Sequence, residues 1–149
     1  MGAVDYATFA YNIWTLPVPS FQPLPLVRRP HAFSHPDWVY EIKYDGFRAL
    51  AYVDGSGARL ISRNGNRFAS FDPLCQSIAF FLRAKSAVLD GEIVCLDSKG
   101  HSQFNELLFL RGTPLFCVFD VLALNGRDLR HLSLGGKQAV LAQQSIGPT

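Results

Sequence analysis

Residues 41–53 read EIKYDGFRALAYV, and this stretch decides how the chain is interpreted. Apolar and aromatic residues alternate with polar ones, which is typical of a half-buried strand. In such a strand Glu41, Lys43 and Asp45 share one face. A glycine then breaks the pattern, and Arg48 follows the break. The segment is either an ordinary solvated face with paired charges or a lysine held in a reactive site.

A lysine side chain is a poor nucleophile at neutral pH, because its ordinary pKa of about 10.4 keeps nearly all of it protonated. Burial or nearby cations make it reactive by favouring the neutral amine. Arg48 is close enough in sequence to act as such a cation. Lys43 is therefore a candidate nucleophile, and paired surface charges explain this segment equally well.

Short strands and turns continue downstream. DGSG at 54–57, NGN at 64–66 and Asn125-Gly126 predict turns, and Asp72-Pro73 predicts the N-cap and first residue of a helix. We expect strands at 38–44, 47–53, 58–63, 87–97 and 114–124, the last of them central, and helices at 73–85, at 104–110 and from 134 onward. Strands dominate and mostly form hairpins, which indicates an α+β domain built on an antiparallel sheet.

The composition is that of a globular protein, because 48% hydrophobic and 17% charged residues exclude a disordered chain. A net charge of +2 is too small to indicate a nucleic-acid partner by itself. The three cysteines are widely spaced, so we expect reduced core cysteines in a cytoplasmic protein. No apolar run reaches about 18 residues, so we expect no membrane span, and the N-terminus lacks a secretory signal.

Three parts are expected along the chain. Six of the nine prolines fall in residues 1–36, which predicts an extended, irregular leader. The alternating pattern predicts one domain over 37–134. Residues 135–149 look like the start of a helix followed by a tail.

Other charged residues also stand out from their surroundings. Asp90 and Glu92 share one face of a predicted strand with a glycine between them, and Asp120 lies inside an apolar run. An acid there is costly unless it is paired, metal-bound or protonated, although it can also brace a turn. Arg63 precedes a tight turn, where its guanidinium can meet a phosphate or a ribose, but such a turn sequence is also common.

Four motifs occur in a fixed order: KYDGFR at 43–48, SRNG at 62–65, DGEIV at 90–94 and FDVL at 119–122. In this order and spacing they resemble the ATP-dependent DNA ligases, and most of all the bacterial ligases of the repair and end-joining type. These ligases belong to the covalent nucleotidyltransferases, together with RNA ligases and mRNA capping enzymes. The resemblance runs from about residue 21 to residue 134. It implies the antiparallel-sheet adenylation domain of a DNA ligase, C-terminally incomplete in this chain.

The resemblance also implies a role for each matching residue. Lys43 matches the nucleophile that attacks the α-phosphate of ATP and becomes lysyl-AMP. The cofactor-binding matches are Glu41 and Ile42 beside the adenine, Arg48 and Arg63 at ribose and phosphate, Glu92 at the ribose and a metal ion, and Phe119 stacked on the adenine. A structural role is equally expected for Asp45 and Asp90, and Asp120 is expected to brace its motif. Lys43 should lie at a strand end that faces a cleft with Glu92 and Phe119.

The implied reaction uses ATP and Mg²⁺, passes AMP to the 5′-phosphate of nicked double-stranded DNA, and seals the nick. The chain departs from the family pattern after Leu124, where it contains Lys137 but no EGxxxK pattern. A separately encoded C-terminal half, which would supply the phosphate-gripping segment, or an OB-fold domain is therefore an expected partner, and the isolated chain should be impaired. Apolar strand edges should be exposed near 115–124.

Three alternatives to an active DNA ligase domain remain at this point. The chain can be a non-enzymatic nucleotide-binding remnant, or an RNA ligase or capping-type nucleotidyltransferase. A nuclease that binds metal through Asp45, Asp90, Glu92 and Asp120 is a further reading. It leaves Lys43 and the order of the motifs unexplained.

Overall fold

The computed structural model describes residues 31, 33–36, 40 and 42–142, which belong to two compact units, Met1–Tyr40 and Glu41–Thr149. In the first unit, the rings of Phe33 and Tyr40 meet edge to face with centroids 6.0 Å apart. The backbone N–H of His35 donates to the hydroxyl of Tyr40. Most of the predicted leader lies outside the described residues, so the three predicted parts of the chain stay predictions.

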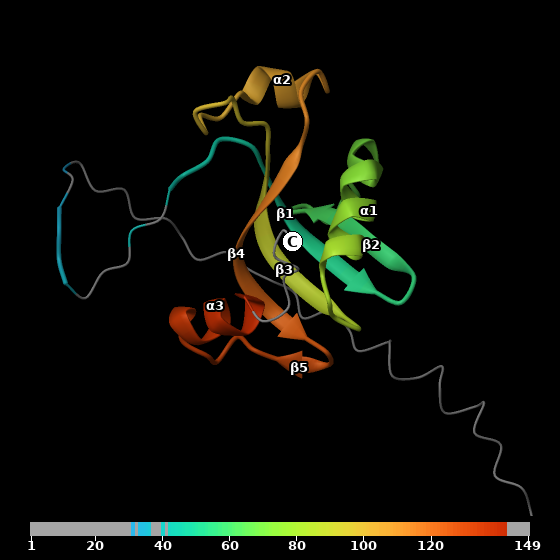
Figure 1. The fold of residues 1–149 in the computed structure, drawn as a ribbon, viewed down its shortest axis with the longest axis vertical. Helices are drawn as coiled ribbons and strands as arrows, with labels where there is room; N and C mark the ends of the chain where they lie inside the picture. Colours follow the sequence, from blue (N-terminus) through green and yellow to red (C-terminus); the bar gives the residue numbers. More distant parts are fainter. Residues whose placement is uncertain (1–30, 32, 37–39, 41, 143–149) are drawn as a thin grey trace, which may run out of the picture. The chain divides into compact units, whose positions relative to one another are not determined.

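The second unit is built on one antiparallel sheet with the strand order β2-β1-β3-β4-β5 (Figure 1). Its strands are β1 (Phe47–Asp54), β2 (Gly57–Ser62), β3 (Ala87–Val94), β4 (Leu115–Leu124) and β5 (Arg127–Asp128). Its helices are the 3-10 turn η1 (Ala69–Phe71), α1 (Asp72–Phe81), α2 (Phe104–Leu108) and α3 (Leu134–Ala142). The predicted α+β class with an antiparallel sheet is confirmed.

The turns lie where the sequence predicts them. Asp54 pairs with Gly57 across the β1–β2 hairpin, and the Asp54 carboxylate accepts a hydrogen bond from the Ser56 N–H at 2.9 Å. Asn125 and Gly126 have φ values of 49° and 79°, so the β4–β5 turn needs two residues that tolerate the left-handed region.

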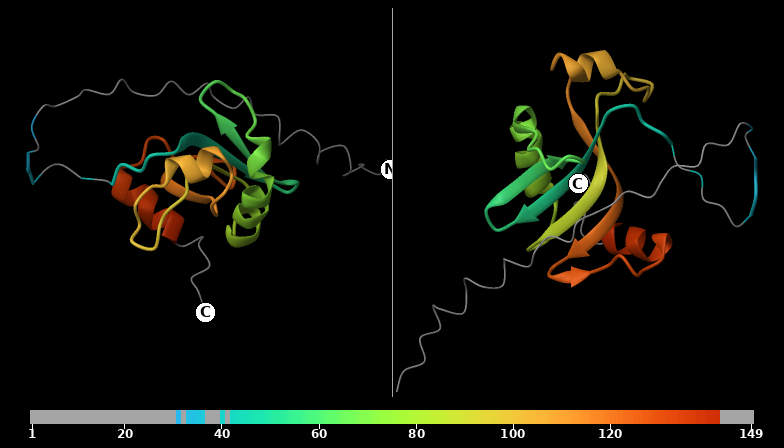
Figure 2. Two further views of the ribbon diagram at one scale, coloured as in Figure 1. Left: turned by 90° about the horizontal axis from the view of Figure 1, so that it is seen from above. Right: turned by 180° about the vertical axis from the view of Figure 1, so that it is seen from behind.

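The hydrophobic core packs the sheet against α1, whose position beside β1 and β2 is seen in Figures 1 and 2. The alternating residues Ala49, Ala51 and Val53 of β1 are buried, as the period-two pattern predicts. On α1, Leu74 and Cys75 are buried against them. Among the described residues, no helix is long and apolar enough to cross a membrane.

Helix α1 differs from its prediction at both ends. Phe71 is the N-cap, and Asp72 is already helical and binds Arg67 at 2.8 Å instead of capping. The helix ends at Phe81, well before residue 85, and Leu82 is extended. Phe81 is 56% exposed, so a longer helix gains no burial in the core, and the chain instead turns toward β3.

The strand predicted at 38–44 is wrong for its described C-terminal part, because residues 42–45 form no strand. Their neighbour β3 ends at Val94, and its outermost pair with β1 joins Phe47 to Ile93. Residues 42–45 therefore have no neighbouring residues of β3 with which to form backbone hydrogen bonds. The N–H of Asp45 donates instead to the hydroxyl of Ser102 at 3.1 Å.

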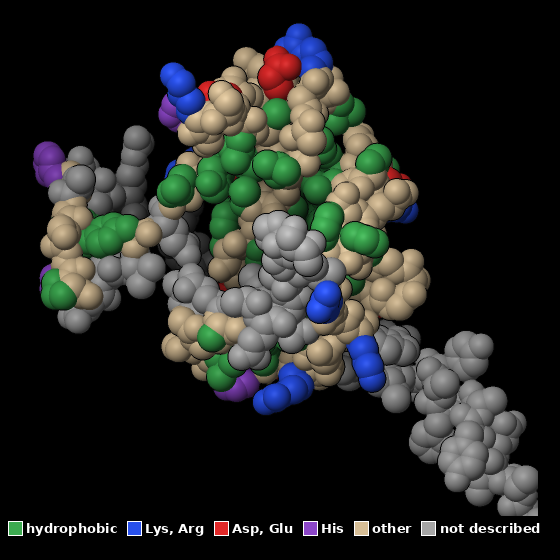
Figure 3. All heavy atoms as spheres, viewed as in Figure 1, with side chains coloured by type: hydrophobic (Ala, Val, Ile, Leu, Met, Phe, Trp, Pro, Cys, Tyr) green, Lys and Arg blue, Asp and Glu red, His purple; other side chains and the backbone are tan. Residues whose placement is uncertain are grey.

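Strand β4 is next to the edge of the sheet, and β3 is the central strand. The short β5 pairs with β4 only at Ala123 and Leu124, so residues 115–122 have no described strand on that side. Figure 3 shows hydrophobic side chains gathered at the surface in the region of α1 and α2. The large exposed hydrophobic residues of this unit are Ile42, Phe80, Phe81, Leu108, Phe109, Leu110 and Leu115. Of these residues, only Leu115 lies in the apolar edge predicted at 115–124, which is strand β4.

Candidate functional site

Arg48 lies at the centre of a charged cluster that three strands build. The register pairs Arg48 of β1 with Glu92 of β3, and Asp90 of β3 with Asp120 of β4. The pKa of Arg48 is raised, chiefly by its hydrogen bond with Asp90 and further by the charges of Asp90, Glu92 and Asp120. The fold therefore brings Asp120, which is distant in the sequence, together with the neighbouring acids Asp90 and Glu92 around one guanidinium.

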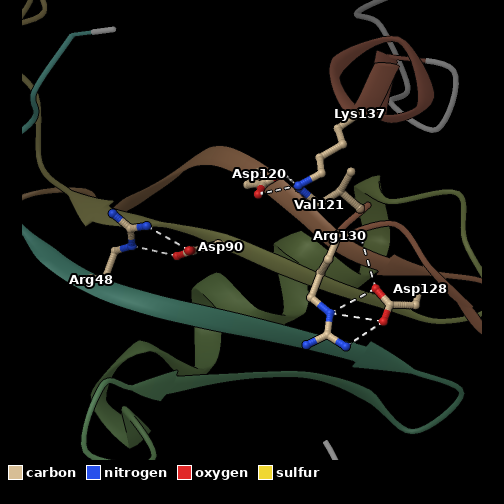
Figure 4. Close-up of polar contacts among 7 residues, drawn as sticks. All are labelled: Arg48, Asp90, Asp120, Val121, Asp128, Arg130 and Lys137. Atoms are coloured by element: carbon tan, nitrogen blue, oxygen red, sulfur yellow. Dashed lines mark hydrogen bonds and ion pairs between the residues drawn. The ribbon is translucent and has the colours of Figure 1, made fainter. Parts of the chain in front are cut away.

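Arg48 and Asp90 form a bidentate ion pair, with distances of 2.6 Å from Nε to Oδ1 and 2.7 Å from Nη2 to Oδ2 (Figure 4). The Asp90 residue is only 3% exposed, so this pair satisfies a buried carboxylate. The Cζ atom of Arg48 also lies 4.9 Å from the centroid of the Phe119 ring. A cation at that distance interacts favourably with the ring face.

The position of Phe119 depends on an irregularity in β4. Asp90 pairs with Asp120, but the next residue, Gly91, pairs with Val118, so Phe119 is an extra residue on β4. Such a bulge re-aims the side chain that it carries. A Cβ atom on Gly91 would lie 2.4 Å from the carbonyl oxygen of Cys117, so the close approach of the two strands here requires glycine.

Lys43 is exposed and lies in the irregular segment that leads into β1. The pKa of Glu92 is raised because its carboxylate is partly buried, and the charges of Arg48 and Lys43 and the backbone N–H of Gly46 act against that rise. Lys43 is thus close enough to Glu92 for their charges to interact. Gly46 lets the chain pass close to β3 just before β1, since a Cβ atom there would lie 2.1 Å from the carbonyl oxygen of Ile93.

Of the other predicted site residues, Ile42 and Arg63 stand apart from this cluster. Glu41 lies outside the described residues, and Ile42 is 73% exposed. Arg63 follows Ser62, whose register partner is Ala49, so Arg63 leaves the sheet at the same end as the cluster. Within the described ranges, no hydrogen bond or ion pair joins Arg63 to the cluster.

No preformed metal cage is present in the described part of the chain, where no three His, Cys, Asp or Glu residues are grouped to hold an ion. Asp90 is committed to Arg48, and Asp120 binds Lys137 at 3.0 Å. Among the described residues, Glu92 is therefore the carboxylate of the cluster that has no basic side chain bound to it.

Two contacts of the site were not predicted from the sequence. The Ser102 hydroxyl holds the backbone two residues beyond Lys43, and no feature of the sequence indicates this. Lys137 stands out in the sequence only as a lone lysine after Leu124. Its ion pair with Asp120 depends on the packing of α3 against β4, which a linear pattern does not show.

The fold is that of an antiparallel-sheet domain of the nucleotidyltransferase class. Residues 27–146 match the sequence model of the family described as "ATP dependent DNA ligase domain". The chain belongs to this family, because the match covers most of its length.

Similar proteins and a solved structure agree with this assignment. A multifunctional non-homologous end joining protein LigD from Pseudomonas aeruginosa is 33% identical over 110 residues, which is 70% of this chain and 13% of that protein. A LigD from Mycobacterium tuberculosis is 39% identical over 94 residues, 62% of this chain and 12% of that protein. The solved structure "mycobacterial DNA ligase D complexed with ATP and MES" has a TM-score of 0.59 and 31% identity, and it covers 69% of this chain and 35% of that chain. The chain thus spans a small part of its curated relatives.

Proposed function

We propose that this chain carries out the first step of an ATP-dependent DNA ligase, in which Lys43 attacks the α-phosphate of ATP. The observation that carries this proposal is the pairing of Arg48 with Glu92 across the sheet, beside the Arg48–Phe119 contact and just after the segment that contains Lys43. An amine, an acid and an aromatic ring are the three kinds of group that the family uses around its nucleotide. Membership of the family supports the same assignment.

In this step the neutral Nζ of Lys43 forms a bond to the α-phosphorus, and the bond from that phosphorus to the bridging oxygen breaks. Pyrophosphate leaves, and the proton of the attacking amine passes to solvent. Positive side chains stabilise the charge that develops on the phosphoryl oxygens. Arg48 is the guanidinium that we propose for that task, and its bidentate bond to Asp90 fixes its orientation.

The nucleotide itself is expected to use Phe119 and Glu92. The ring of Phe119 offers an aromatic surface on which a purine can stack. Glu92 is the proposed partner of the ribose and of Mg²⁺. Proteins commonly hold Mg²⁺ with one or two carboxylates plus the substrate phosphates, so a single acid fits this ion. Bound Mg²⁺ would supply neutralisation of the triphosphate charge.

We infer that the whole ligase then passes AMP to the 5′-phosphate of nicked double-stranded DNA, where a 3′-hydroxyl displaces AMP and seals the strand. The names of the similar proteins, which refer to non-homologous end joining, favour a role in DNA repair. The 149 residues contain no EGxxxK pattern, so we expect this chain alone to react slowly. A phosphate-gripping segment or an OB-fold domain is the proposed partner.

Incubation of the full chain with α-labelled ATP and Mg²⁺ tests the proposal. Slow, covalent labelling that is lost in Lys43→Ala and kept in Lys85→Ala is expected, because Lys85 lies beyond the opposite end of β3. Labelling that survives Lys43→Ala would reject Lys43 as the nucleophile. Binding of ATP without any labelling would instead support a nucleotide-binding remnant.

A further inference from the structure

Lys137 is the cation that joins α3 to the charged cluster. Its Nζ lies 3.0 Å from Oδ2 of Asp120, and its side chain is only 11% exposed (Figure 4). The other carboxylate oxygen of Asp120 accepts a hydrogen bond from the backbone N–H of Val121 at 2.8 Å. Asp120 is therefore held by its own strand on one side and by the helix on the other.

Asp120 is a neighbour of both the proposed nucleotide-stacking ring and the Arg48–Asp90 ion pair. It directly follows Phe119, the extra residue of the β4 bulge, and pairs across the sheet with Asp90. Its charge also acts on Arg48. A change in the charge of Asp120 therefore alters the electrostatic potential at the Arg48 guanidinium and beside the Phe119 ring, which we assign to the nucleotide.

Lys137 brings the formal charge of the cluster closer to neutrality. Asp90, Glu92 and Asp120 contribute three negative charges, and Asp45, whose charge also acts on Glu92, contributes a fourth. Arg48 and Lys43 contribute two positive charges, and Lys137 supplies a third through Asp120. Without Lys137, the cluster carries two net negative charges instead of one where we propose that a triphosphate binds, and like charges repel.

We propose that Lys137 is a positioning residue for ATP, which acts through Asp120 by neutralising the third carboxylate of the site. This inference rests on the proposed function, because it takes ATP as the ligand. It adds that α3, which supplies none of the proposed nucleotide contacts, sets the affinity of the site for a polyanion.

Two roles of Lys137, fastening α3 to the sheet or neutralising Asp120, predict opposite effects of Asp120→Asn on ATP binding. If the ion pair only fastens α3 to the sheet, Lys137→Met and Asp120→Asn both break it and should both weaken ATP binding. If Lys137 acts by neutralisation, Lys137→Met weakens binding, whereas Asp120→Asn removes a negative charge and tightens it. Asparagine can still accept the hydrogen bond from Val121, so the strand keeps its local contact.

Equilibrium dialysis of the full chain with Mg²⁺ and α-labelled ATP measures these effects. Lys137→Met is expected to raise the dissociation constant about three- to tenfold at low salt, and less at high salt, since salt screens charges near the surface. The double variant Lys137→Met/Asp120→Asn should return to within about twofold of the unaltered chain, and Lys137→Arg should match that chain. Lys85→Met is the matched control for net charge.

Weaker binding by Asp120→Asn, or a dissociation constant that Lys137→Met does not change, would overturn the inference. Thermal melts show whether each variant is folded. If Lys137→Met does not fold, the direction of the change in ATP affinity in Asp120→Asn decides between the two roles. ATP binding in the expected order without labelling of Lys43 would support the role of Lys137 and reject the catalytic step. Absence of ATP binding by the unaltered chain would overturn both.

Discussion

Arg48 and Asp90 form the tightest polar contact of the candidate site, and their burial is unequal. The side chain of Asp90 is 5% exposed, whereas that of Arg48 is 45% exposed and also reaches the ring of Phe119. The pair therefore links β1, β3 and β4 through one guanidinium. Loss of Arg48 leaves a buried carboxylate without a partner, whereas loss of the Asp90 charge leaves a guanidinium that is already partly exposed to water.

We predict that Arg48→Ala destabilises the domain more than Asp90→Asn. The first change leaves a buried carboxylate without its partner, which typically costs about 3–5 kcal/mol. The second leaves an arginine that can turn to water, so about 1–2 kcal/mol is expected for the lost hydrogen bonds. Urea unfolding of the two variants measures the difference. An equal or larger loss for Asp90→Asn would contradict this account of the pair.

Much of the fold could be predicted from the sequence, because its signals are local. The hairpin after Asp54 and the turn at Asn125 both depend on residues that tolerate turn conformations, and these are visible in the chain itself. The alternation in β1 predicts which of its residues are buried. Each of these features needs only a few neighbouring residues to be recognised.

The contacts of the site could be predicted only in part, because they depend on register. The motifs indicate Lys43, Arg48 and Glu92, but no pattern shows the bulge that makes Phe119 an extra residue of β4. The irregular path before β1 follows from the end of β3 at Val94, which is a property of the assembled sheet. Such long-range pairing is decided by the whole fold.

Gly46→Ala should separate the fold from the placement of Lys43. The new Cβ atom would lie 2.1 Å from the carbonyl oxygen of Ile93 and 3.0 Å from Cγ of Glu92, so backbone must move. A loss of about 1–3 kcal/mol is expected from such overpacking, together with loss of Lys43 labelling. Gly55→Ala is the control, because a Cβ atom there meets nothing within 4 Å. Equal stability and labelling of both variants would show that the segment has room to adjust.

Ser102→Ala tests whether the hydroxyl that holds Asp45 also sets the position of Lys43. The N–H of Asp45 loses its acceptor at 3.1 Å, and because this contact is exposed, water can replace it. We expect a stability loss of no more than about 1 kcal/mol and a clear reduction in the rate of Lys43 labelling. Ser77→Ala, which removes a hydroxyl from α1, should change neither property to that extent. Unchanged labelling in Ser102→Ala would mean that other contacts hold the segment.

Glu92 links the stability of the domain to its proposed activity. Burial raises the pKa of this carboxyl above its ordinary value of 4.5, so the folded state binds the proton more tightly than the unfolded state does. The contribution of Glu92 to stability is therefore most favourable at low pH. It declines as the pH rises from the unfolded pKa through the folded one.

We predict that Glu92→Gln becomes more stable relative to the unaltered chain as the pH is raised from 4 to 7, because glutamine has no charge to bury. The same change should lower the rate of Lys43 labelling by about 10²–10³, the usual effect of removing one electrostatic contact from a transition state. Urea unfolding at several pH values and labelling with α-labelled ATP measure the two effects on the same samples.

Glu106→Gln, which removes a carboxylate from the exposed ion pair with Arg111, controls for net charge in the labelling assay. A gain in stability without a loss of labelling would mean that Glu92 is strained for a reason other than this reaction. A loss of labelling without the pH-dependent gain would mean that burial of the carboxylate costs the fold nothing.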